Sequence, residues 1–519
     1  MRKEFYIALV VVCALNVLFY FYWTIGLLSL FFFVPFFALG IRDIRQTRHA
    51  IKSNFPVFGH FRYLLESIRP EINQYFIESN TDGRPFSREQ RSVVYQRAKK
   101  VLDTVPFGTQ HDVYKQGYEF VTHSMYPKHV SEKDLRIMVG GEKCKQPYSL
   151  SLLNISAMSF GSLSTNAILS LNGGAKDGDF AHNTGEGGIS PYHLEMGGDL
   201  IWQIGTGYFG CRTHDGVFDP ELFKKNSRHP HVKMIEIKLS QGAKPGHGGI
   251  LSGKKVTQEI ANIRNVPLGK DVISPPGHSA FHDAAEMLTF IETLRELSGG
   301  KPVGIKLCLG HRREFEELVS LMAKKNSYPD FIAVDGAEGG TGAAPLEFSN
   351  YMGMPGIDAL VIVVDTLKKF GVRDKVKVLA TGKITTAFDI VKLLCIGADA
   401  TYAARSMLLA LGCIQALRCN NNKCPTGVAT QDPNLVKGLH VPTKRERVKN
   451  FHGETLGTVA HIIGAMGFSR HQDLSRADLY KRIDENHIKT YQDLYPEPTP
   501  LNSSHGEEAR EISLKPETV

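Results

Sequence analysis

Short apolar segments alternate with longer stretches of helical spacing along residues 149–406. Residues 280–297, 314–325 and 385–397 place apolar side chains three and four positions apart, which is the period of an amphipathic helix. Alternating strands and helices are typical of a parallel sheet, and eight strands favour an α/β fold of the closed (β/α)8 TIM type over an open doubly wound sheet. The predicted strands are residues 149–159, 179–184, 200–207, 233–240, 302–308, 330–336, 375–382 and 399–406.

The N-terminal stretch from Phe5 to Ile41 contains no charged residue. One helix of that length would span roughly 55 Å at about 1.5 Å per residue, whereas the hydrocarbon core of a bilayer is about 30 Å thick. Two shorter helices joined near residues 23–26 fit better. The stretch is too long for a signal peptide, and no small-residue cleavage site follows it.

Basic residues flank this apolar stretch on both sides. Arg2 and Lys3 precede it, and Arg42, Arg45 and Arg48 follow it. Positive flanks at both ends predict a transmembrane helical hairpin with both ends in the cytoplasm. We therefore expect contact with membrane lipid through this hairpin, in the inner membrane of the cell, with the catalytic domain facing the cytoplasm.

The pattern divides the chain into five predicted regions. These are the hairpin anchor at 1–48, a juxtamembrane and covering arm at 49–148, the barrel domain at 149–437, C-terminal helices at 438–490 and a disordered tail at 491–519. Within them, residues 437–483 read as helices that close the barrel. The tail is predicted from its Pro, Ser, Glu and Lys content.

Composition narrows the class of protein. Of the 519 residues 42% are hydrophobic and 22% are charged, which is ordinary for a globular protein. The net charge of +8 is modest for this length, and no Lys/Arg block is interleaved with aromatic residues, so nucleic acid is not a predicted partner. Five of the eight cysteines are scattered singly, which indicates reduced thiols rather than a disulfide framework.

The carboxyl ends of the predicted strands carry polar residues and glycines. In a closed parallel barrel these ends meet at the mouth that holds the active site. The residues at these positions are Ser159, Glu186, Lys238, Lys306, Asp335 and Gly382.

The segment EIKLSQGAKPGHGG, residues 236–249, concentrates positive charge in a loop rich in Gly and Pro. Lys238 lies at a strand end, Lys244 follows six residues later, and Arg264 ends the segment EIANIR. Together they could collect a dicarboxylate or a flavin phosphate, because Arg offers a bidentate fork and Lys a point charge. The alternative of solvated surface lysines is disfavoured by the constrained loop.

Three loops are candidates for phosphate or cofactor contact. Residues 380–389 and 397–406 follow the positions of strands 7 and 8, where barrels of this class often bind phosphate. Residues 337–345 add closely spaced glycines that let backbone approach a cofactor. Each of these could also be a plain strand–helix turn. The sequence has no GxGxxG in a βαβ context, so we do not expect a nicotinamide site.

Cys413, Cys419 and Cys424 are spaced C-x5-C-x4-C. The simplest alternative is three unrelated cysteines buried as small apolar residues. Against it, Cys419 and Cys424 lie in the polar segment RCNNNKCP, where a buried apolar side chain is not expected. A zinc site would need a fourth ligand, and the loop contains no His. Three thiolates without a fourth partner suit a three-iron cluster better than a four-iron one.

Six motifs in order resemble the FMN-binding synthase domain of glutamate synthase, over roughly residues 100–480. They are SAMSFGSLS at 156–164, HNTGEGG at 182–188, EIKLSQGAKPGHGG at 236–249, ISPPGH at 273–278, GGTGAAP at 339–345 and GC-x5-C-x4-CPTGVATQDP at 412–433. The resemblance implies an FMN-containing (β/α)8 barrel with a 3Fe-4S cluster. It also implies that reduced FMN delivers hydride to an imine of 2-oxoglutarate and ammonia, which yields glutamate.

The resemblance also assigns residue roles. Cys413, Cys419 and Cys424 would ligate iron; Lys238, Glu186 and Lys244 would be catalytic, with Lys238 facing the flavin and Glu186 handling protons. Substrate would be held by Lys244, Arg264 and Gln241. The implied FMN contacts are Ser159, Lys238, Lys306, Gly339, Gly340, Thr341, Gly382, Lys383, Ala403 and Ala404.

The chain also departs from the family pattern. Met1 leads into the apolar stretch where large glutamate synthases carry a glutaminase domain, so we expect ammonia to come free or from another subunit. The family's PGEGGQLPG reads PGHGGILSG here, which places His247 and Ile250 where Glu and Gln are usual. Two alternatives therefore stay open, a related flavoenzyme for another 2-oxo acid or amine and a membrane-tethered electron-transfer subunit. In each case an electron-donor protein or reductase subunit must supply electrons.

Overall fold

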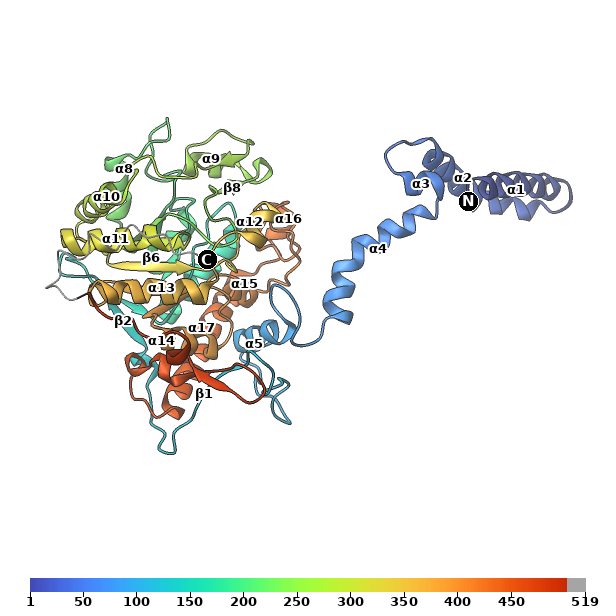
Figure 1. Cartoon of the computed structure of the whole chain (residues 1–519). Helices are drawn as coiled ribbons and strands as arrows, with labels where there is room; N and C mark the ends of the chain where they lie inside the picture. The colour runs from blue at the N-terminus through green and yellow to red at the C-terminus, as the bar shows by residue number, and fades with distance from the viewer. Residues whose placement is uncertain (502–519) are drawn as a thin grey trace, which may run out of the picture. The chain divides into compact units, whose positions relative to one another are not determined.

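The computed structural model describes residues 1–501. They form two compact units, residues 1–88 and residues 89 onward, which are described separately. Figure 1 shows the first unit in dark to light blue, whereas the larger second unit begins in light blue and continues through green and yellow to red.

The first unit begins with two apolar helices. Helix α1 (Arg2–Tyr22) and helix α2 (Leu30–Arg45) are joined by the 3-10 segment η1 (Thr24–Ser29). They run antiparallel, because Phe5 near the start of α1 packs on Phe37 near the end of α2, and Ser29 donates a hydrogen bond to Asn16. The stretches Arg2–Tyr22 and Thr24–Arg45 are each long and apolar enough to cross a membrane, which confirms the prediction of two N-terminal apolar helices. The rest of this unit contains α3 (Ala50–Asn54), α4 (Gly59–Ile72) and the π-helical turn η2 (Asn73–Ile77).

The second unit is built on a closed barrel of eight parallel strands within the described residues, which confirms the predicted fold class. All eight predicted strand segments contribute a strand, and the strands pair in chain order around the barrel, with β13 closing on β4. The strands are β4 (Leu153–Ile155), β5 (His182–Asn183), β6 (Leu200–Ile204), β7 (Val232–Lys238), β10 (Val303–Cys308), β11 (Phe331–Asp335), β12 (Lys377–Thr381) and β13 (Ala400–Ala403).

Helices connect these strands and surround the barrel (Figure 1). Several begin at a residue whose side chain caps the first turn, as Ser164 does for α6 and Thr386 does for α14. The helices are α6 (Thr165–Gly178), α7 (Pro191–Glu195), α8 (Pro220–Ser227), α9 (Gln258–Arg264), α10 (Ala284–Leu297), α11 (Arg312–Lys325), α12 (Leu346–Tyr351), α13 (Gly356–Lys369), α14 (Ala387–Ile396) and α15 (Arg405–Leu411).

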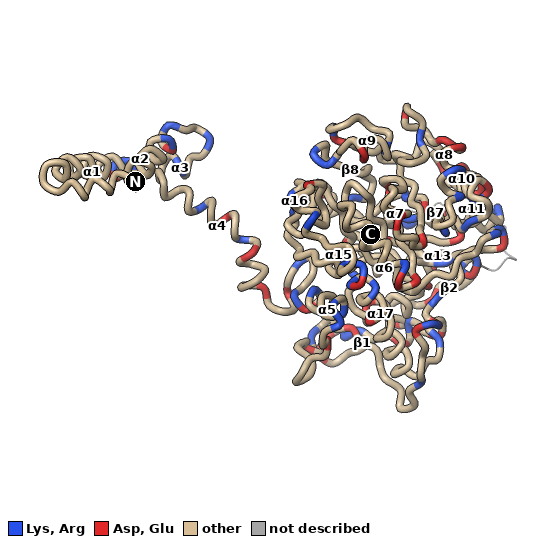
Figure 2. Tube along the Cα trace, turned by 180° about the vertical axis from the view of Figure 1, so that it is seen from behind, with Lys and Arg blue, Asp and Glu red and all other residues tan. Residues whose placement is uncertain are grey.

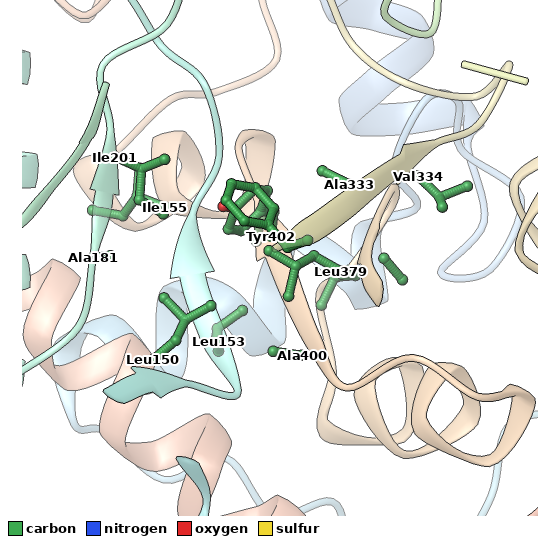
Figure 3. Packing of buried hydrophobic residues seen from close by; sticks show 14 of the residues in the cluster. Leu150, Leu153, Ile155, Ala181, Ile201, Ala333, Val334, Leu379, Ala400 and Tyr402 are labelled. Carbon is green, nitrogen blue, oxygen red and sulfur yellow. The ribbon is translucent and has the colours of Figure 1, made fainter. Parts of the chain in front are cut away.

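Apolar side chains from the barrel strands form a continuous core. Ile155, Ile201 and Leu379 are fully buried, and Figure 3 shows them among neighbouring side chains from adjacent strands. Trp202 on β6 stacks on Phe223 of α8, with ring centroids 5.2 Å apart. Burial on both faces of the strands explains why the sequence shows continuous apolar runs there rather than strict alternation.

Smaller elements lie around the barrel. The predicted strand 149–159 is split, because β3 (Tyr148–Ser151) pairs antiparallel with β2 (Arg136–Val139) and only β4 enters the barrel. A continuous apolar run gives no sign of such a break. The other small elements are the sheet β1 (Glu119–Val121), β14 (Leu479–Arg482) and β15 (Ile488–Thr490), the pair β8 (Ile250–Leu251) and β9 (Val272–Ile273), α5 (Arg88–Lys99) and α16 (Pro433–Val436).

The C-terminal region is helical over a shorter range than the sequence suggested. Helix α17 (Val441–Ala465) packs against α6, α14 and α15, but residues 479–482 form strand β14 instead of helix. The pairing of β14 with β1, some 360 positions earlier, overrides local preference. The predicted tail at 491–519 begins with helix α18 (Tyr491–Leu494), so that boundary is wrong. Residues 502–519 lie outside the described part of the chain.

The contact between α10 and the start of β11 gives a test of the fold. Asp330 is 4% exposed and accepts hydrogen bonds from Arg295 at 3.0 Å, from the Val303 amide at 2.8 Å and from the Gly141 amide at 2.8 Å. Asp330→Ala removes one of the two carboxylates that pair with the buried Arg295 and takes away the acceptor of the Val303 and Gly141 amides, so we expect it to destabilise the barrel by about 2–5 kcal/mol. Denaturant unfolding followed by the emission of buried Trp202 measures this. The matched control is Glu317→Ala, which removes an exposed pair with Arg313 and is expected to leave the transition unchanged. An equal effect of both variants would contradict the prediction.

Candidate active site

A polar pocket opens at the carboxyl ends of the barrel strands. Lys238 ends β7, Asp335 ends β11 and Thr381 ends β12, and all three line the pocket. The full lining is Ser156, Ala157, Gln203, Lys238, Gln241, Lys306, Asp335, Gly339, Gly340, Thr381, Gly382, Tyr402, Ala404 and Arg405. The pocket therefore lies where a barrel of this class holds its active site.

A cluster of four charged side chains adjoins this pocket, of which three are buried cations and one is a partly buried carboxylate. Lys238 donates a hydrogen bond from Nζ to Glu186 Oε1 at 2.7 Å. Lys244 and Arg264 are both within electrostatic range of the same carboxylate. Lys238, Lys244 and Arg264 are 6%, 4% and 4% exposed, so three cations face one carboxylate away from water. This excess of positive charge suits an anionic ligand.

Burial and charge set the protonation of the cluster. Burial alone would raise the pKa of Glu186, but the charge and hydrogen bond of Lys238 outweigh it and hold the pKa of Glu186 below its ordinary value. Burial lowers the pKa of Lys244 to about 8. Burial also lowers the pKa of Arg264 to about 10. Glu186 is thus an anion at neutral pH, and Lys244 is the cation most easily neutralised.

Glycines bring the backbone close to these charges. A Cβ at Gly205 would lie 2.6 Å from Glu186 Oε2, and one at Gly249 would lie 2.5 Å from Glu186 Oε1. A Cβ at Gly187, in the predicted motif NTGEGG, would lie 2.6 Å from Arg264 Nη2. The glycine-rich motifs found in the sequence therefore make room for the charged cluster.

Arg264 is anchored by the loop after β4. Its Nη2 donates to Ser159 Oγ at 3.3 Å and to the Phe160 carbonyl at 3.0 Å, and its guanidinium lies over the Phe209 ring at 5.2 Å. Ser159 therefore positions Arg264 and is absent from the pocket lining. Lys244 donates to the Ala343 carbonyl at 3.1 Å, and Thr341 donates to the same carbonyl at 3.2 Å.

Asp335 ties four segments of the pocket together. It accepts hydrogen bonds from Thr381 Oγ1 at 2.6 Å and from the Gly242 amide at 3.0 Å, and Lys306 Nζ lies 3.5 Å from it. Burial raises the pKa of this carboxyl group, but Lys306 and these hydrogen bonds keep it below its ordinary value. Asp335 therefore holds β7, β10, β11 and β12 together at the mouth.

A second buried carboxyl group lies deeper in the barrel. Glu236 on β7 accepts hydrogen bonds at Oε1 from Asn183 at 2.8 Å and from Gln203 at 2.6 Å. Burial raises the pKa of Glu236 above its ordinary value. Gln203 also lines the pocket, so this network connects the barrel interior with the site.

The predicted site residues divide by position. Those lining the pocket are Lys238, Gln241, Lys306, Gly339, Gly340, Gly382 and Ala404. Glu186, Lys244 and Arg264 form the adjoining charged cluster with Lys238, while Thr341, Lys383 and Ala403 are absent from the pocket lining. The sequence reasoning did not assign Gln203, Tyr402 or Arg405 to the site. Gln203 and Tyr402 read only as interior strand positions, but Arg405 directly follows the predicted pair 403–404 and could have been found.

The three predicted iron ligands share one loop after α15. Cys424 is buried and Cys413 and Cys419 are half-buried, and the three thiols interact electrostatically. Burial raises the pKa of Cys413 to about 12. Cys424 differs, because hydrogen bonds from Thr426 and nearby backbone amides outweigh burial and lower its pKa. Lys255 is 3% exposed, lies within electrostatic range of Cys419 and Cys424, and donates to the Ser162 carbonyl at 2.9 Å.

This loop is not preassembled around a single ion. Among residues 1–501 no group of three His, Cys, Asp or Glu side chains is placed to hold one metal ion. In an iron–sulfur cluster each thiolate binds a different iron, so the sulfurs are spaced more widely than the ligands of one ion. The three thiols lie close enough to interact electrostatically, and Lys255 is buried near two of them, which fits the ligands of such a cluster.

Comparison with known proteins identifies the family. The family model "Conserved region in glutamate synthase" matches residues 107–469. "Glutamate synthase large subunit-like protein YerD" of Bacillus subtilis is 39% identical over 497 residues, which cover 88% of this chain and 94% of that protein. "Archaeal-type glutamate synthase [NADPH]" of Thermotoga neapolitana is 34% identical over 320 residues, covering 62% of this chain and 60% of that protein.

Solved structures give a more distant likeness. Flavocytochrome b2 with sulfite bound aligns with a TM-score of 0.42 and 14% identity, covering 85% of this chain and 92% of that chain. That likeness carries no argument about function. On the family model and the Bacillus relative, the chain belongs to the glutamate synthase family of oxidoreductases.

Proposed function

We propose that the protein is an FMN- and iron–sulfur-dependent oxidoreductase that reduces the imine of 2-oxoglutarate and ammonia to glutamate. The observation that carries this proposal is the charged cluster of Glu186, Lys238, Lys244 and Arg264 beside the polar pocket. Three cations around one carboxylate leave an unbalanced positive charge that a dicarboxylate can neutralise. Both relatives described above are named as glutamate synthases or proteins like them, which supports glutamate as the product.

The residues that line the pocket suit contact with FMN. Backbone approaches closely at Gly339 and Gly340, where an added Cβ would lie within 2.8 Å of Asp335 Oδ1 and 2.7 Å of Arg405 Nε respectively. Lys306 and Arg405 line the same pocket and supply charge for a phosphate or a reduced ring. When bound there, FMN supplies the hydride that reduces the substrate carbon.

The residues of the chain then bind and orient the substrate. Arg264 is held by Ser159 and the Phe160 carbonyl, so its guanidinium can bind a carboxylate with little loss of entropy. Lys244, whose Nζ donates a hydrogen bond to the Ala343 carbonyl, adds a second positive charge. Lys238 and Glu186 share a hydrogen bond of 2.7 Å and can hold the proton that the substrate nitrogen takes up as it is reduced.

In this proposal, electrons reach the flavin through the loop after α15 that carries the three cysteines. Cys413, Cys419 and Cys424 would hold a 3Fe-4S cluster, which would supply single electrons to the flavin site. The positive charge of Lys255 beside two of the thiols offsets the negative charge of thiolates. A separate electron-donor protein or reductase subunit delivers the electrons. The apolar hairpin α1–α2 anchors the protein in the inner membrane, with the barrel in the cytoplasm.

A related substrate is the second candidate. Ile250 lies in β8 and is half-buried, and it presents an apolar side chain where the family motif has an amide. His247 packs edge-on against Phe348, with ring centroids 5.3 Å apart, and its Nδ1 lies 2.9 Å from the Gly248 carbonyl. Another 2-oxo acid with a less polar end would suit this loop better than 2-oxoglutarate.

Anaerobic flavin reoxidation tests the reaction. Protein purified with its flavin is reduced chemically, mixed with 2-oxoglutarate and ammonium, and followed by flavin absorbance. We expect reoxidation with formation of an equal amount of glutamate, because two electrons pass to each imine. Arg264→Leu is expected to slow this by about 100-fold or more, since it removes a charged bidentate contact. Reoxidation only by a different 2-oxo acid would support the second candidate, and none with any 2-oxo acid would contradict the proposal.

The pH dependence of substrate binding tests the role of Lys244. Its pKa is lowered to about 8 by burial, so it is positively charged below pH 8 and neutral above it. Glu186 is already ionised in this range because its pKa is lowered. The Kd for 2-oxoglutarate should therefore rise with pH above 8, by up to about tenfold per pH unit. Lys244→Arg keeps its charge and should flatten the profile. Calorimetry on oxidised protein without ammonium measures this Kd and avoids the titration of ammonia. If the variant shows the same dependence of Kd on pH as the unchanged protein, Lys244 is not the group that titrates.

Iron content and EPR test the cluster. Cys419→Ser removes one proposed ligand, so we expect loss of iron and of the EPR signal of an oxidised three-iron cluster while FMN stays bound. Cys13→Ser is the matched control, because Cys13 is an exposed thiol of α1. Equal iron and equal spectra in the two variants would show that the loop does not hold a cluster.

A further inference from the structure

One side of helix α4 and of the following turn η2 is apolar and exposed. Phe58, Phe61, Leu65, Ile68 and Phe76 recur at helical spacing, and their side chains are 40–83% exposed. Residues three and four positions apart share a helix face, so these side chains form one continuous stripe. We call this stripe the α4 apolar face.

The other side of α4 is polar. Glu66 and Ser67 lie away from the apolar stripe, whereas Arg62 and Arg69 border it, since each is three or four positions from Leu65. Arg62 and Glu66 form an exposed ion pair at 3.5 Å. Figure 2 shows charged residues at intervals along α4, separated by uncharged positions. Such a helix has one face suited to an apolar medium and one suited to water.

Contacts within the first unit place the start of α4 at the charged end of the hairpin. Asp43 near the end of α2 accepts a hydrogen bond from the Val57 amide at 2.9 Å, and His60 Nε2 lies 2.9 Å from the same carboxylate. Arg2 at the start of α1 contacts Ser53. The start of α1, the end of α2 and the start of α4 therefore meet at one level.

If the hairpin anchors the protein as proposed, the end of the hairpin where α1 starts and α2 ends lies at a membrane–water boundary. The hairpin carries Arg2, Lys3, Arg42 and Arg45 at this end, whereas Phe5–Ile41 is uncharged. Figure 2 shows the hairpin uncoloured along most of its length, with Lys and Arg near α3. A helix that starts at this boundary and is apolar on one side lies beside lipid.

We propose that α4 is an interfacial helix that lies along a phospholipid bilayer, with the α4 apolar face in the acyl region and Arg62 and Arg69 at the headgroups. The inference rests on the membrane anchor of the proposed function but adds a second, in-plane contact. Lipid is the occupant because the apolar face continues from the apolar hairpin and Arg side chains border it. An interfacial helix buries its apolar face about 5–10 Å into the headgroup–acyl boundary.

Tryptophan quenching by brominated lipid tests this in the full chain. The chain has two Trp residues, of which Trp202 is fully buried in the barrel core and Trp23 lies between α1 and α2. In a Trp23→Phe background, Phe61→Trp and Leu65→Trp place a reporter on the α4 apolar face. Glu66→Trp and Ser67→Trp place the same reporter on the polar face. Each protein is reconstituted in phosphatidylcholine–phosphatidylglycerol bilayers with and without dibrominated acyl chains.

We expect brominated chains to remove about half of the added emission at positions 61 and 65, and a much smaller part at positions 66 and 67. Equal quenching at all four positions would overturn the proposal. Blue-shifted emission at 61 and 65 without quenching would also overturn it, because a second copy or another part of the chain would then cover the face. The unchanged chain provides the separate test of the anchor. Quenching of Trp23 without quenching at 61 and 65 leaves the anchor standing and refutes the interfacial helix, and no quenching of Trp23 refutes the anchor itself.

Discussion

The desolvated pairing of Glu186 with Lys238 is the interaction on which the active-site region depends. A carboxylate cannot be removed from water without a partner, and the 2.7 Å hydrogen bond to Lys238 provides one. Lys244 and Arg264 are then left with more positive charge than this single carboxylate balances. The barrel tolerates this arrangement because its mouth is a place where an anion can enter. This excess of positive charge therefore favours an anionic ligand at the mouth of the barrel.

Much of the fold follows from the pattern of the sequence. All eight predicted strand segments contribute to the barrel, and they could be predicted because short apolar runs alternate with stretches of helical spacing. The division of 149–159 into β3 and β4 could not be predicted, since it depends on the pairing of β3 with β2. Likewise β14 exists because β1 lies beside it, and residues 479–482 carry no sign of so distant a partner.

The candidate site was partly predictable for a different reason. Lys238, Lys306 and Asp335 stand at strand ends, and closure of the barrel necessarily brings strand ends together. Ser159 shows the limit of this reasoning, because it stands at a strand end yet supports Arg264 instead of lining the pocket. The carboxylate network of Glu236, Asn183 and Gln203 was missed because each residue reads as an isolated polar position within an apolar strand.

The Asp335 carboxylate has a consequence for how this site can vary between related proteins. It binds the Gly242 amide and the Thr381 hydroxyl and lies beside Lys306, and a Cβ at Gly242 would come within 1.9 Å of the Gly336 carbonyl. Four loops are thus fastened to one another on this side of the mouth, and a change in any of them must be matched in the rest. His247 and Ile250 lie farther along the loop that contains Gly242, and neither side chain contacts Asp335 in the contacts described above, since His247 packs on Phe348 and Ile250 lies in β8. Substitutions at these two positions can therefore accumulate while the contacts of Asp335 stay fixed.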